Sequence, residues 1–271
     1  MSPDERAVLD RALLGARLTA YPHGEFVGQE SFMSASEVLT LARRAGIAPG
    51  VSVLDVCCGV AGPGRLIAAE LGCAYLGVDA SSSAIEIARE RAEVPCEFRV
   101  GRIPPLPAGP FDVVLLLETM LAFPDKQSLL AGVSAALPPG GRFAFTVEEG
   151  PALTSTERAL MPAADTVWPV PLPELLSALE GQGLRVRWHA DWTASHRSTV
   201  DSLLRAFRAE DAHLRARLGD RAVDDLLAAH GCWSEWLRDG RVRKFAFVAE
   251  QDQAQRGGGR VPAPARTVAS Q

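Results

Sequence analysis

The chain has 271 residues, of which 47% are hydrophobic, so it is long and apolar enough to bury one sizeable core. We find no apolar run of about 18 residues and no basic start followed by an apolar stretch, and we therefore expect neither a membrane span nor a signal peptide. The net charge is −5 and the arginines are scattered among acidic residues, which argues against a nucleic-acid partner. The five cysteines lack metal-ligand spacing, so we expect no metal site and a reducing, cytoplasmic location.

The first predicted unit, residues 1–46, is an N-terminal helical cap. Ser2 and the proline and acids that follow it predict the start of one helix. A capping box that begins at Ser34 opens a second helix, which Gly46 ends. Between these helices, residues 21–32 form an aromatic and glycine-rich loop that is too irregular for a helix or a strand.

Residues 53–65 combine a short apolar strand, a sharp glycine-rich turn and the start of an apolar-periodic helix. Such a turn leaves backbone N–H groups pointing at whatever lies above it, and small residues let a ligand approach closely. The next strand ends on Asp79, and a carboxylate at that point suits the two hydroxyls of a ribose. The pattern therefore predicts a site for a nucleoside cofactor, either NAD or S-adenosylmethionine.

Strands and helices alternate through residues 47–150, which predicts a Rossmann-like α/β core with a doubly wound, mostly parallel sheet. Its ligand is expected beyond the carboxyl ends of the strands. Three helices are expected in this core, at 64–71, 82–92 and 126–136. The seven predicted strands span 51–56, 74–79, 96–100, 111–117, 142–148, 184–192 and 244–250.

Residues 151–250 are predicted to supply substrate-pocket insertions and the last two strands, which form a late antiparallel hairpin. A proline-punctuated insert comes first, and two helical segments, 198–218 and 220–230, form a C-terminal helical insertion between the strands. Residues 251–271 lack a hydrophobic face, so we expect a disordered tail there.

The glycine-rich turn resembles the first motif of class I methyltransferases, Asp-x-Gly-x-Gly-x-Gly. It is especially similar to the Gly-Cys-Gly-x-Gly-Gly-Pro-Ala-Arg variant of small-molecule C- and N-methyltransferases. Cys57 stands in place of the first glycine, Ala61 in place of a later one, and Gly64 in place of the alanine. A turn that needs a positive φ at Cys57 would be strained.

Later segments resemble the same family, and the match covers about residues 20–250. Phe111–Leu117 is similar to its fourth strand, and Leu137–Gly141 to its Leu-x-Pro-Gly-Gly turn into the fifth. The sequence Asp191-Trp192-Thr193 resembles the Asp-x-Thr of sarcosine, phosphoethanolamine, tocopherol and menaquinone-precursor methyltransferases.

The resemblance implies S-adenosyl-L-methionine as the cofactor, with Asp79 on the ribose hydroxyls and Gly59 against the methionine half. Where the family often has Gly-Asp-Ala, with the acid on the adenine amine, this chain has Gly101-Arg102-Ile103. A sulfonium centre needs shielding from water, so we expect the cap loop, residues 20–33, to become ordered over the cofactor. The residues expected to bind the cofactor are Tyr21, Gln29, Asp55, Cys57, Gly59, Asp79, Ala80, Arg102, Ile103 and Glu118.

Two residues are candidates for catalysis. Glu118 follows five apolar residues at the tip of the fourth strand, where the methyl group would lie; a solvated or cofactor-binding carboxylate is the alternative. His230 continues an apolar helical stripe one residue before Gly231, which is expected to end the helix; a buried structural histidine is the alternative. We predict that the two side chains converge on the acceptor from opposite walls of one pocket.

All five tryptophans lie in the second half of the chain, which suggests an aromatic acceptor pocket. Trp188 and Trp192 share the apolar side of one predicted strand and are assigned to the core. The residues expected to bind the acceptor are Phe32, Trp168, His196, Trp233 and Trp236.

The function that the resemblance implies is methyl transfer to a small molecule. The aromatic residues and the absence of nucleic-acid features point to N or C of an electron-rich natural product of the amine or indole type. An NAD-dependent reductase is one alternative, although neither Tyr21 nor Tyr75 begins the Tyr-x-x-x-Lys pair that it would need. The other alternative, suggested by Cys57, Ala61 and Arg102, is a protein of this fold that binds the cofactor without methylating. The expected partner is a small-molecule substrate, and the expected state is a monomer or homodimer.

Overall fold

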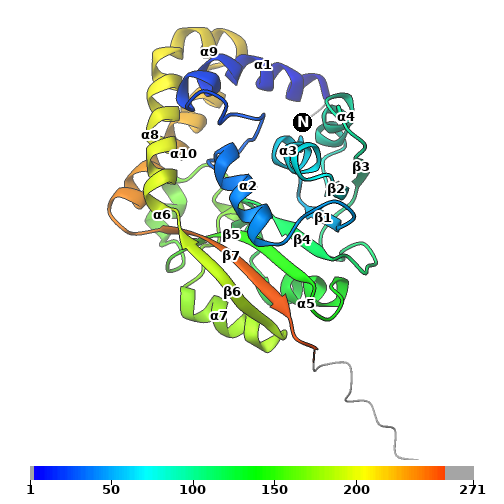
Figure 1. Cartoon of the computed structure of the whole chain (residues 1–271). Helices are drawn as coiled ribbons and strands as arrows, with labels where there is room; N and C mark the ends of the chain where they lie inside the picture. The colour runs from blue at the N-terminus through cyan, green and yellow to red at the C-terminus, as the bar shows by residue number, and fades with distance from the viewer. Residues whose placement is uncertain (1–2, 254–271) are drawn as a thin grey trace, which may run out of the picture.

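The computed structural model describes residues 3–253, and its centre is a seven-stranded sheet in the order β3-β2-β1-β4-β5-β7-β6 (Figure 1). Strands β1 to β5 are parallel, and β7 runs antiparallel to both of its neighbours. The predicted fold class is confirmed. The strands are β1 (Ser52–Val56), β2 (Ala74–Asp79), β3 (Glu97–Val100), β4 (Val113–Leu116), β5 (Arg142–Glu149), β6 (Leu184–Asp191) and β7 (Arg243–Gln251).

Helices cover both faces of the sheet, as the alternating pattern predicts. One face packs against α2 (Ala35–Arg44), α3 (Gly62–Leu71) and α4 (Ser82–Glu90). The other packs against α5 (Lys126–Ala136) and α7 (Leu172–Gly181). The central strands β1 and β4 are almost wholly buried because helices lie on both sides of them, whereas the edge strands β3 and β6 are partly exposed. The short elements η1 (Met120–Ala122), α6 (Ser155–Leu160) and η2 (Ala164–Thr166) follow β4 and β5.

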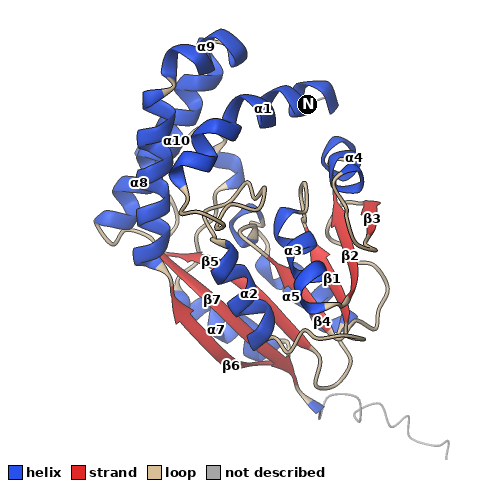
Figure 2. Ribbon diagram, turned by 45° about the horizontal axis from the view of Figure 1, so that its top comes forward, coloured by secondary structure: helices blue, strands red, loops and turns tan. Residues whose placement is uncertain are grey.

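Four helices form a cap above the carboxyl ends of the parallel strands (Figure 2). They are α1 (Pro3–Ala20), α8 (Thr193–Ala209), α9 (Asp211–Leu218) and α10 (Asp220–Arg238), and they share their own apolar cluster. Helix α1 lies across α8 and also reaches α4, where Asp10 pairs with Arg91 at 2.9 Å. The N-terminal and C-terminal helical insertions therefore form one layer, although α2 packs on the sheet.

The C-terminal insertion differs from its prediction in two ways. The predicted helix 198–218 is two helices, because the chain breaks at Glu210 and the first helix already begins at Thr193. The helix that was expected to end at Gly231 continues to Arg238. A glycine inside a helix costs only about 1 kcal/mol relative to alanine, and continuing the helix buries Trp236 and Leu237.

The structure describes only part of the two chain ends for which the sequence made predictions. Gln251, assigned to the disordered tail, is the last residue of β7 and pairs with Leu184. Residues 254–271 and the predicted helix start at Ser2 lie outside the described residues. Within residues 3–253, no helix is both long and apolar enough to cross a membrane.

Candidate active site

A pocket of about 240 Å³, which we call the cofactor pocket, lies at the carboxyl ends of β1, β2 and β4. Its wall includes the glycine-rich turn after β1, at residues 57–63. Asp79 at the end of β2, Glu118 just after β4, and residues 28–31 of the cap loop contribute the rest of the polar wall. This is the edge at which open α/β sheets bind their ligands.

The glycine-rich turn has a left-handed backbone at Cys57, the conformation that was expected to be strained there. Cys57 has a φ of +61° and Ala61 a φ of +56°, in a region that costs residues other than glycine about 1–2 kcal/mol. Gly62 has a different constraint, because an added Cβ would lie 2.5 Å from the carbonyl oxygen of Val27. The turn thus keeps a glycine where the cap loop lies directly against it.

Gly64, which stands in place of the resembled motif's alanine, also has a physical explanation. An added Cβ would overlap the hydroxyl of Tyr75. That hydroxyl is held in place because it donates a 2.5 Å hydrogen bond to Asp55. Asp55 itself is buried, and burial raises the pKa of its carboxyl to about 7. The buried pair Asp55 and Tyr75 therefore requires the smaller residue at position 64.

Asp79 is fixed by two backbone N–H groups. Its carboxylate accepts hydrogen bonds from the N–H of Gly59 at 2.9 Å and of Ser81 at 2.8 Å, one on each oxygen. Each carboxylate oxygen can accept a second bond. The residue can therefore hold a ribose diol while it also fixes the turn.

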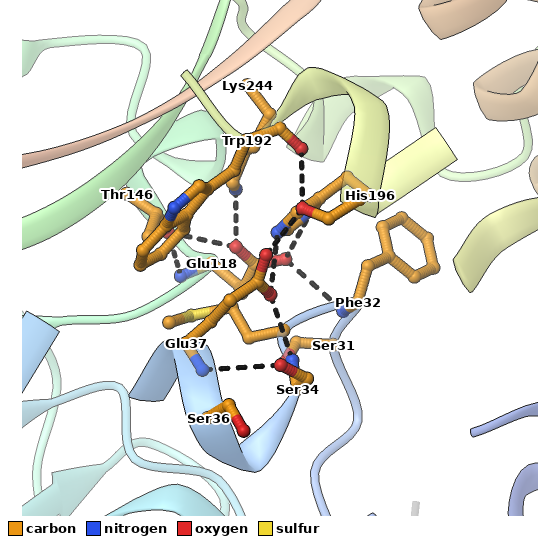
Figure 3. Close-up of polar contacts among 12 residues, drawn as sticks. Ser31, Phe32, Ser34, Ser36, Glu37, Glu118, Thr146, Trp192, His196 and Lys244 are labelled. Carbon is orange, nitrogen blue, oxygen red and sulfur yellow. Dashed lines mark hydrogen bonds and ion pairs between the residues drawn. The ribbon is translucent and has the colours of Figure 1, made fainter. Parts of the chain in front are cut away.

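Glu118 lies in a buried polar cluster with residues from β5, β7, α8 and the cap loop (Figure 3). Its carboxylate contacts the ammonium of Lys244 at 2.5 Å, accepts a hydrogen bond from the Thr146 hydroxyl at 3.0 Å, and accepts another from the N–H of Phe32 at 3.3 Å. The imidazole of His196 lies 3.7 Å away. Glu118 also has a φ of +61°, so both its backbone and its side chain are held by their surroundings.

The pKa values of the groups in this cluster are shifted in different directions. Burial tends to raise the pKa of Glu118, but Lys244, His196 and the hydrogen bonds outweigh burial and lower it to about 2. Burial lowers the pKa of His196 to about 4, so its ring is neutral near pH 7. Burial raises the pKa of both Glu148 and Glu37. Glu118 is therefore ionised near pH 7, and it lies at the wall of the cofactor pocket.

Comparison with known proteins agrees with this geometry. Residues 53–141 match the family model described as a methyltransferase domain. This segment, about a third of the chain, is therefore similar to methyltransferase domains. The cofactor is S-adenosylmethionine, which removes the NAD-dependent alternative. The pocket fits this group because the Asp79 carboxylate keeps acceptor positions that could bind a ribose diol.

Similar sequences share only part of their length with this methyltransferase domain. Methyltransferase GfsG of Streptomyces halstedii is 32% identical over 112 residues, which are 39% of this chain and 40% of that protein. Phosphoethanolamine N-methyltransferase 2 of Caenorhabditis elegans is 30% identical over 118 residues, or 41% of this chain and 27% of that protein. The matched region thus spans less than half of these curated relatives.

Solved structures show the same fold over most of the chain. Phosphoethanolamine N-methyltransferase 2 of Haemonchus contortus, in complex with phosphomonomethylethanolamine and S-adenosylhomocysteine, has a TM-score of 0.75 and 19% identity. The alignment covers 90% of this chain and 58% of that one. The [4+2]-cyclase SpnF has a TM-score of 0.70 and 19% identity, with 91% and 94% covered. The fold therefore extends beyond residues 53–141.

A second, smaller pocket of about 60 Å³ lies inside the cap of the methyltransferase, and we call it the cap pocket. His230 lines this pocket, whereas Glu118 lines the cofactor pocket, so the structure does not bring the two side chains into one pocket. The Phe32 ring packs against His196 at 6.3 Å and His230 at 5.7 Å between ring centres. The two pockets share Gln29, Glu30 and Ser31. The lining of the cap pocket is Arg17, Tyr21, Gln29, Glu30, Ser31, Phe32, Leu203, Phe207, Leu226 and His230.

The predicted cofactor residues fall into three groups. Those that line the cofactor pocket are Gln29, Asp55, Cys57, Gly59, Asp79 and Glu118. Tyr21 lines the cap pocket instead. Ala80 and Arg102 are exposed, and Ile103 packs on the core of the sheet, so these three lie outside the wall of the cofactor pocket.

Four of the five predicted acceptor residues line neither the cofactor pocket nor the cap pocket. Trp233 and Trp236 belong to an apolar cluster beside α6, because the helix that carries them continues past Gly231. Trp168 is covered by the guanidinium of Arg158 at 4.2 Å. His196 is buried behind Glu118, and Phe32 lines the cap pocket.

Sequence reasoning missed Lys244, the cation of the Glu118 cluster. Strand β7 is antiparallel, so its beginning lies at the same edge as the ends of β4 and β5, where Glu148 pairs with Lys244 across the strands. A signal was present, because Lys244 has the same strand parity as the buried residues Ala246 and Val248. A lysine on the apolar side of a strand needs a buried partner.

Proposed function

We propose that this methyltransferase transfers the methyl group of S-adenosylmethionine to N or C of a small, electron-rich acceptor of the amine or indole type. The observation that carries the proposal is the adjacency of an ionised carboxylate and a neutral imidazole, one in each of two neighbouring pockets. Glu118 stands at the wall of the cofactor pocket, His230 lines the cap pocket, and residues 29–31 are common to both. The bound cofactor would supply an electrophilic methyl group.

Glu118 is suited to anchor the acceptor rather than to remove its proton. A carboxylate with a pKa of about 2 is a weak base near pH 7, where efficient proton transfer needs a pKa close to the working pH. As a fixed charge it accepts a hydrogen bond from an N–H group of the acceptor and raises the electron density there. Its contacts with Thr146 and Lys244 keep it from turning away.

His230 is suited to accept the proton. Its Nδ1 lies 2.8 Å from the carbonyl oxygen of Leu226, and a carbonyl only accepts, so Nδ1 carries the hydrogen. The lone pair is therefore on Nε2. Burial lowers the pKa of the ring, which keeps it neutral and able to act as a base near pH 7.

The aromatic rings around His230 support a flat acceptor. The ring centres of Phe207 and Phe32 lie 5.0 and 5.7 Å from the imidazole, both edge-on, and Tyr21 lines the same pocket. Such rings favour stacking with an indole or another aromatic amine. We accordingly propose a natural product of secondary metabolism, and take indole-containing cyclic dipeptides as one concrete class to test.

A second candidate is a protein that binds the cofactor without transferring its methyl group. The solved structure of a [4+2]-cyclase, which aligns over 94% of its length, favours this candidate, because that protein is described as a cyclase and not as a methyltransferase. A cytoplasmic location and a monomeric or homodimeric state are also proposals. The location is supported by the five cysteines, all of which are free thiols in the described residues.

One assay separates the candidates. The protein is incubated with S-adenosylmethionine that carries an isotopic label in its methyl group, together with aromatic amines and cyclic dipeptides. Transfer of the label to one of these compounds supports the proposed function. Tight binding of the cofactor without transfer to any compound, while a compound is converted to an unmethylated product, supports the second candidate instead.

A further inference from the structure

We propose that Lys244 is a positioning residue which, by bridging Glu118 and Glu148, keeps the Glu118 carboxylate ionised and aimed at the cofactor pocket. This inference rests on the proposed function, which places Glu118 beside the transferred methyl group. Lys244 does not line the cofactor pocket, and it acts only through Glu118.

Glu118 needs such a partner because its position is unfavourable in two ways. Its left-handed backbone is disfavoured for every residue except glycine. Its side chain is only 10% exposed, and a buried carboxylate without a cation would take up a proton instead of staying charged. Glu118 keeps this strained backbone and this buried charge, which indicates that both serve a function.

Lys244 is placed to supply the charge. Its side chain is 1% exposed, and its ammonium lies 2.5 Å from one carboxylate oxygen of Glu118 and 2.5 Å from one of Glu148. Glu148 is its direct cross-strand neighbour on β5, so the bridge is built into the register of the sheet. The two carboxylates raise the pKa of Lys244 against the effect of burial, and the ammonium stays charged.

No other described group can take over this task. The titratable groups that face Glu118 are Lys244 from β7, Glu148 from β5, His196 from α8, Glu37 from α2 and Tyr21 from the cap loop. Among them only Lys244 is cationic near pH 7, because burial keeps the His196 ring neutral. Without Lys244, Glu118 would share a buried site with other acids, and its pKa would rise.

The charge of Glu118 can be measured without knowing the acceptor. S-adenosylmethionine carries a sulfonium cation, whereas S-adenosylhomocysteine has a neutral thioether at the same position. An ionised carboxylate nearby therefore strengthens the binding of the first relative to the second. The ratio of the two dissociation constants, measured by calorimetry at several pH values, reports the ionisation of Glu118.

The experiment compares the wild type with Lys244→Met between pH 5 and pH 7. In the wild type, Glu118 stays ionised across this range, so the preference for S-adenosylmethionine should follow only groups that both proteins share, such as Asp55 with its pKa of about 7. In Lys244→Met, the pKa of Glu118 rises, and we expect the preference to drop from pH 7 to pH 5 by about tenfold more than it does in the wild type. Lys126→Met is the matched control, because it removes the other lysine of the chain, which bonds to the carbonyls of Phe123 and Trp168.

A double variant, Lys244→Met with Glu148→Gln, covers the case in which the single variant fails to fold, because it removes the repulsion between two buried acids. The same pH dependence is expected in it. A folded variant without Lys244 whose preference changes with pH no more than that of the wild type overturns the positioning role and leaves the proposed function intact. A wild-type protein that binds neither compound contradicts the proposed function itself, and with it the inference.

Discussion

The cofactor pocket and the cap pocket are neighbours built on different principles. Around the cofactor pocket, a short stretch of chain from β1 to the end of β2 supplies backbone groups, small residues and Asp79. Around the cap pocket, side chains such as Arg17, Phe207 and His230 come from three separate helices. Recognition by backbone tolerates changes of sequence, as Cys57 and Ala61 show, whereas recognition by side chains changes with each substitution. We infer that the first pocket fixes the donor and the second sets the choice of acceptor.

One variant in each pocket tests this comparison, because His230 lines the cap pocket and Glu118 lines the cofactor pocket. We expect His230→Ala to lower the turnover number by about 10²- to 10⁴-fold, because it removes the proposed base. We expect Glu118→Gln to lower it by about 10²-fold or more through loss of the anchoring charge. Both rates are measured with the acceptor identified by the labelling assay, and affinity for S-adenosylhomocysteine is the control. Wild-type rates in both variants would leave proximity alone as the mechanism.

A variant of Asp55 tests whether the cofactor pocket contains a neutral carboxyl group. Its folded pKa of about 7 lies above the unfolded value of 3.8, so its contribution to stability is complete below about pH 4 and is lost as the pH rises to 7. Relative to Asp55→Asn, the wild type should lose up to about 4 kcal/mol of unfolding free energy between pH 4 and pH 7. Urea unfolding at several pH values measures this difference. A constant difference between the two proteins would show that Asp55 is ionised throughout.

Asp79 tests recognition of the donor directly. Two hydrogen bonds to a charged acceptor, each contributing about 1.5 to 3 kcal/mol, should make Asp79→Ala bind S-adenosylhomocysteine at least about tenfold more weakly. Calorimetry measures the change, and Asp191→Ala, at the end of β6, is a control outside the pocket. Unchanged affinity in Asp79→Ala would remove the assigned ribose contact.

The cap loop forms the boundary between the two pockets. Of the effects predicted here, we expect the change in its hydrogen exchange to be the smallest. The side chain of Gln29 bonds to the backbone of Glu25, Val27 and Met33, so the loop already has internal support. We expect residues 20–33 to exchange their amide hydrogens more slowly when S-adenosylhomocysteine is bound. Hydrogen exchange followed by mass spectrometry provides the measurement, and the sheet provides the internal reference. Equal exchange in both states would mean that the loop does not close over the cofactor.

The sequence predicted the sheet well because its elements depend on local patterns. Period-two apolar strands, capping residues and the turn after Asp55 are contained within short stretches, and the helix at 126–136 has the bounds that were predicted. The predicted end of α10 was wrong, because Gly231 is a local signal for the end of a helix. The helix continues instead, because Trp236 packs against residues that are distant in the sequence. A local signal is overridden where packing against distant apolar residues stabilises the helix by more than a single glycine destabilises it.

The site was harder to predict because it depends on which strand ends meet. Asp79 and Glu118 were found because parallel strands place their ends at one edge. Lys244 begins a strand of opposite direction, and only the three-dimensional order of β5 and β7 places it beside Glu118. His230 was assigned to the correct apolar face, but its partners in the cap pocket come from segments whose pairing no sequence period encodes.

The position of β7 bears on the order in which a newly made chain acquires its parts. This strand lies between β5 and β6, although it is made after both, so β6 has no neighbour in the described sheet until β7 inserts. A nascent chain that has emerged only as far as Arg238 holds the whole glycine-rich turn and Asp79, yet lacks the ammonium that faces Glu118. Ribosomal synthesis must therefore pass residue 244 before the carboxylate beside the donor acquires its charge partner.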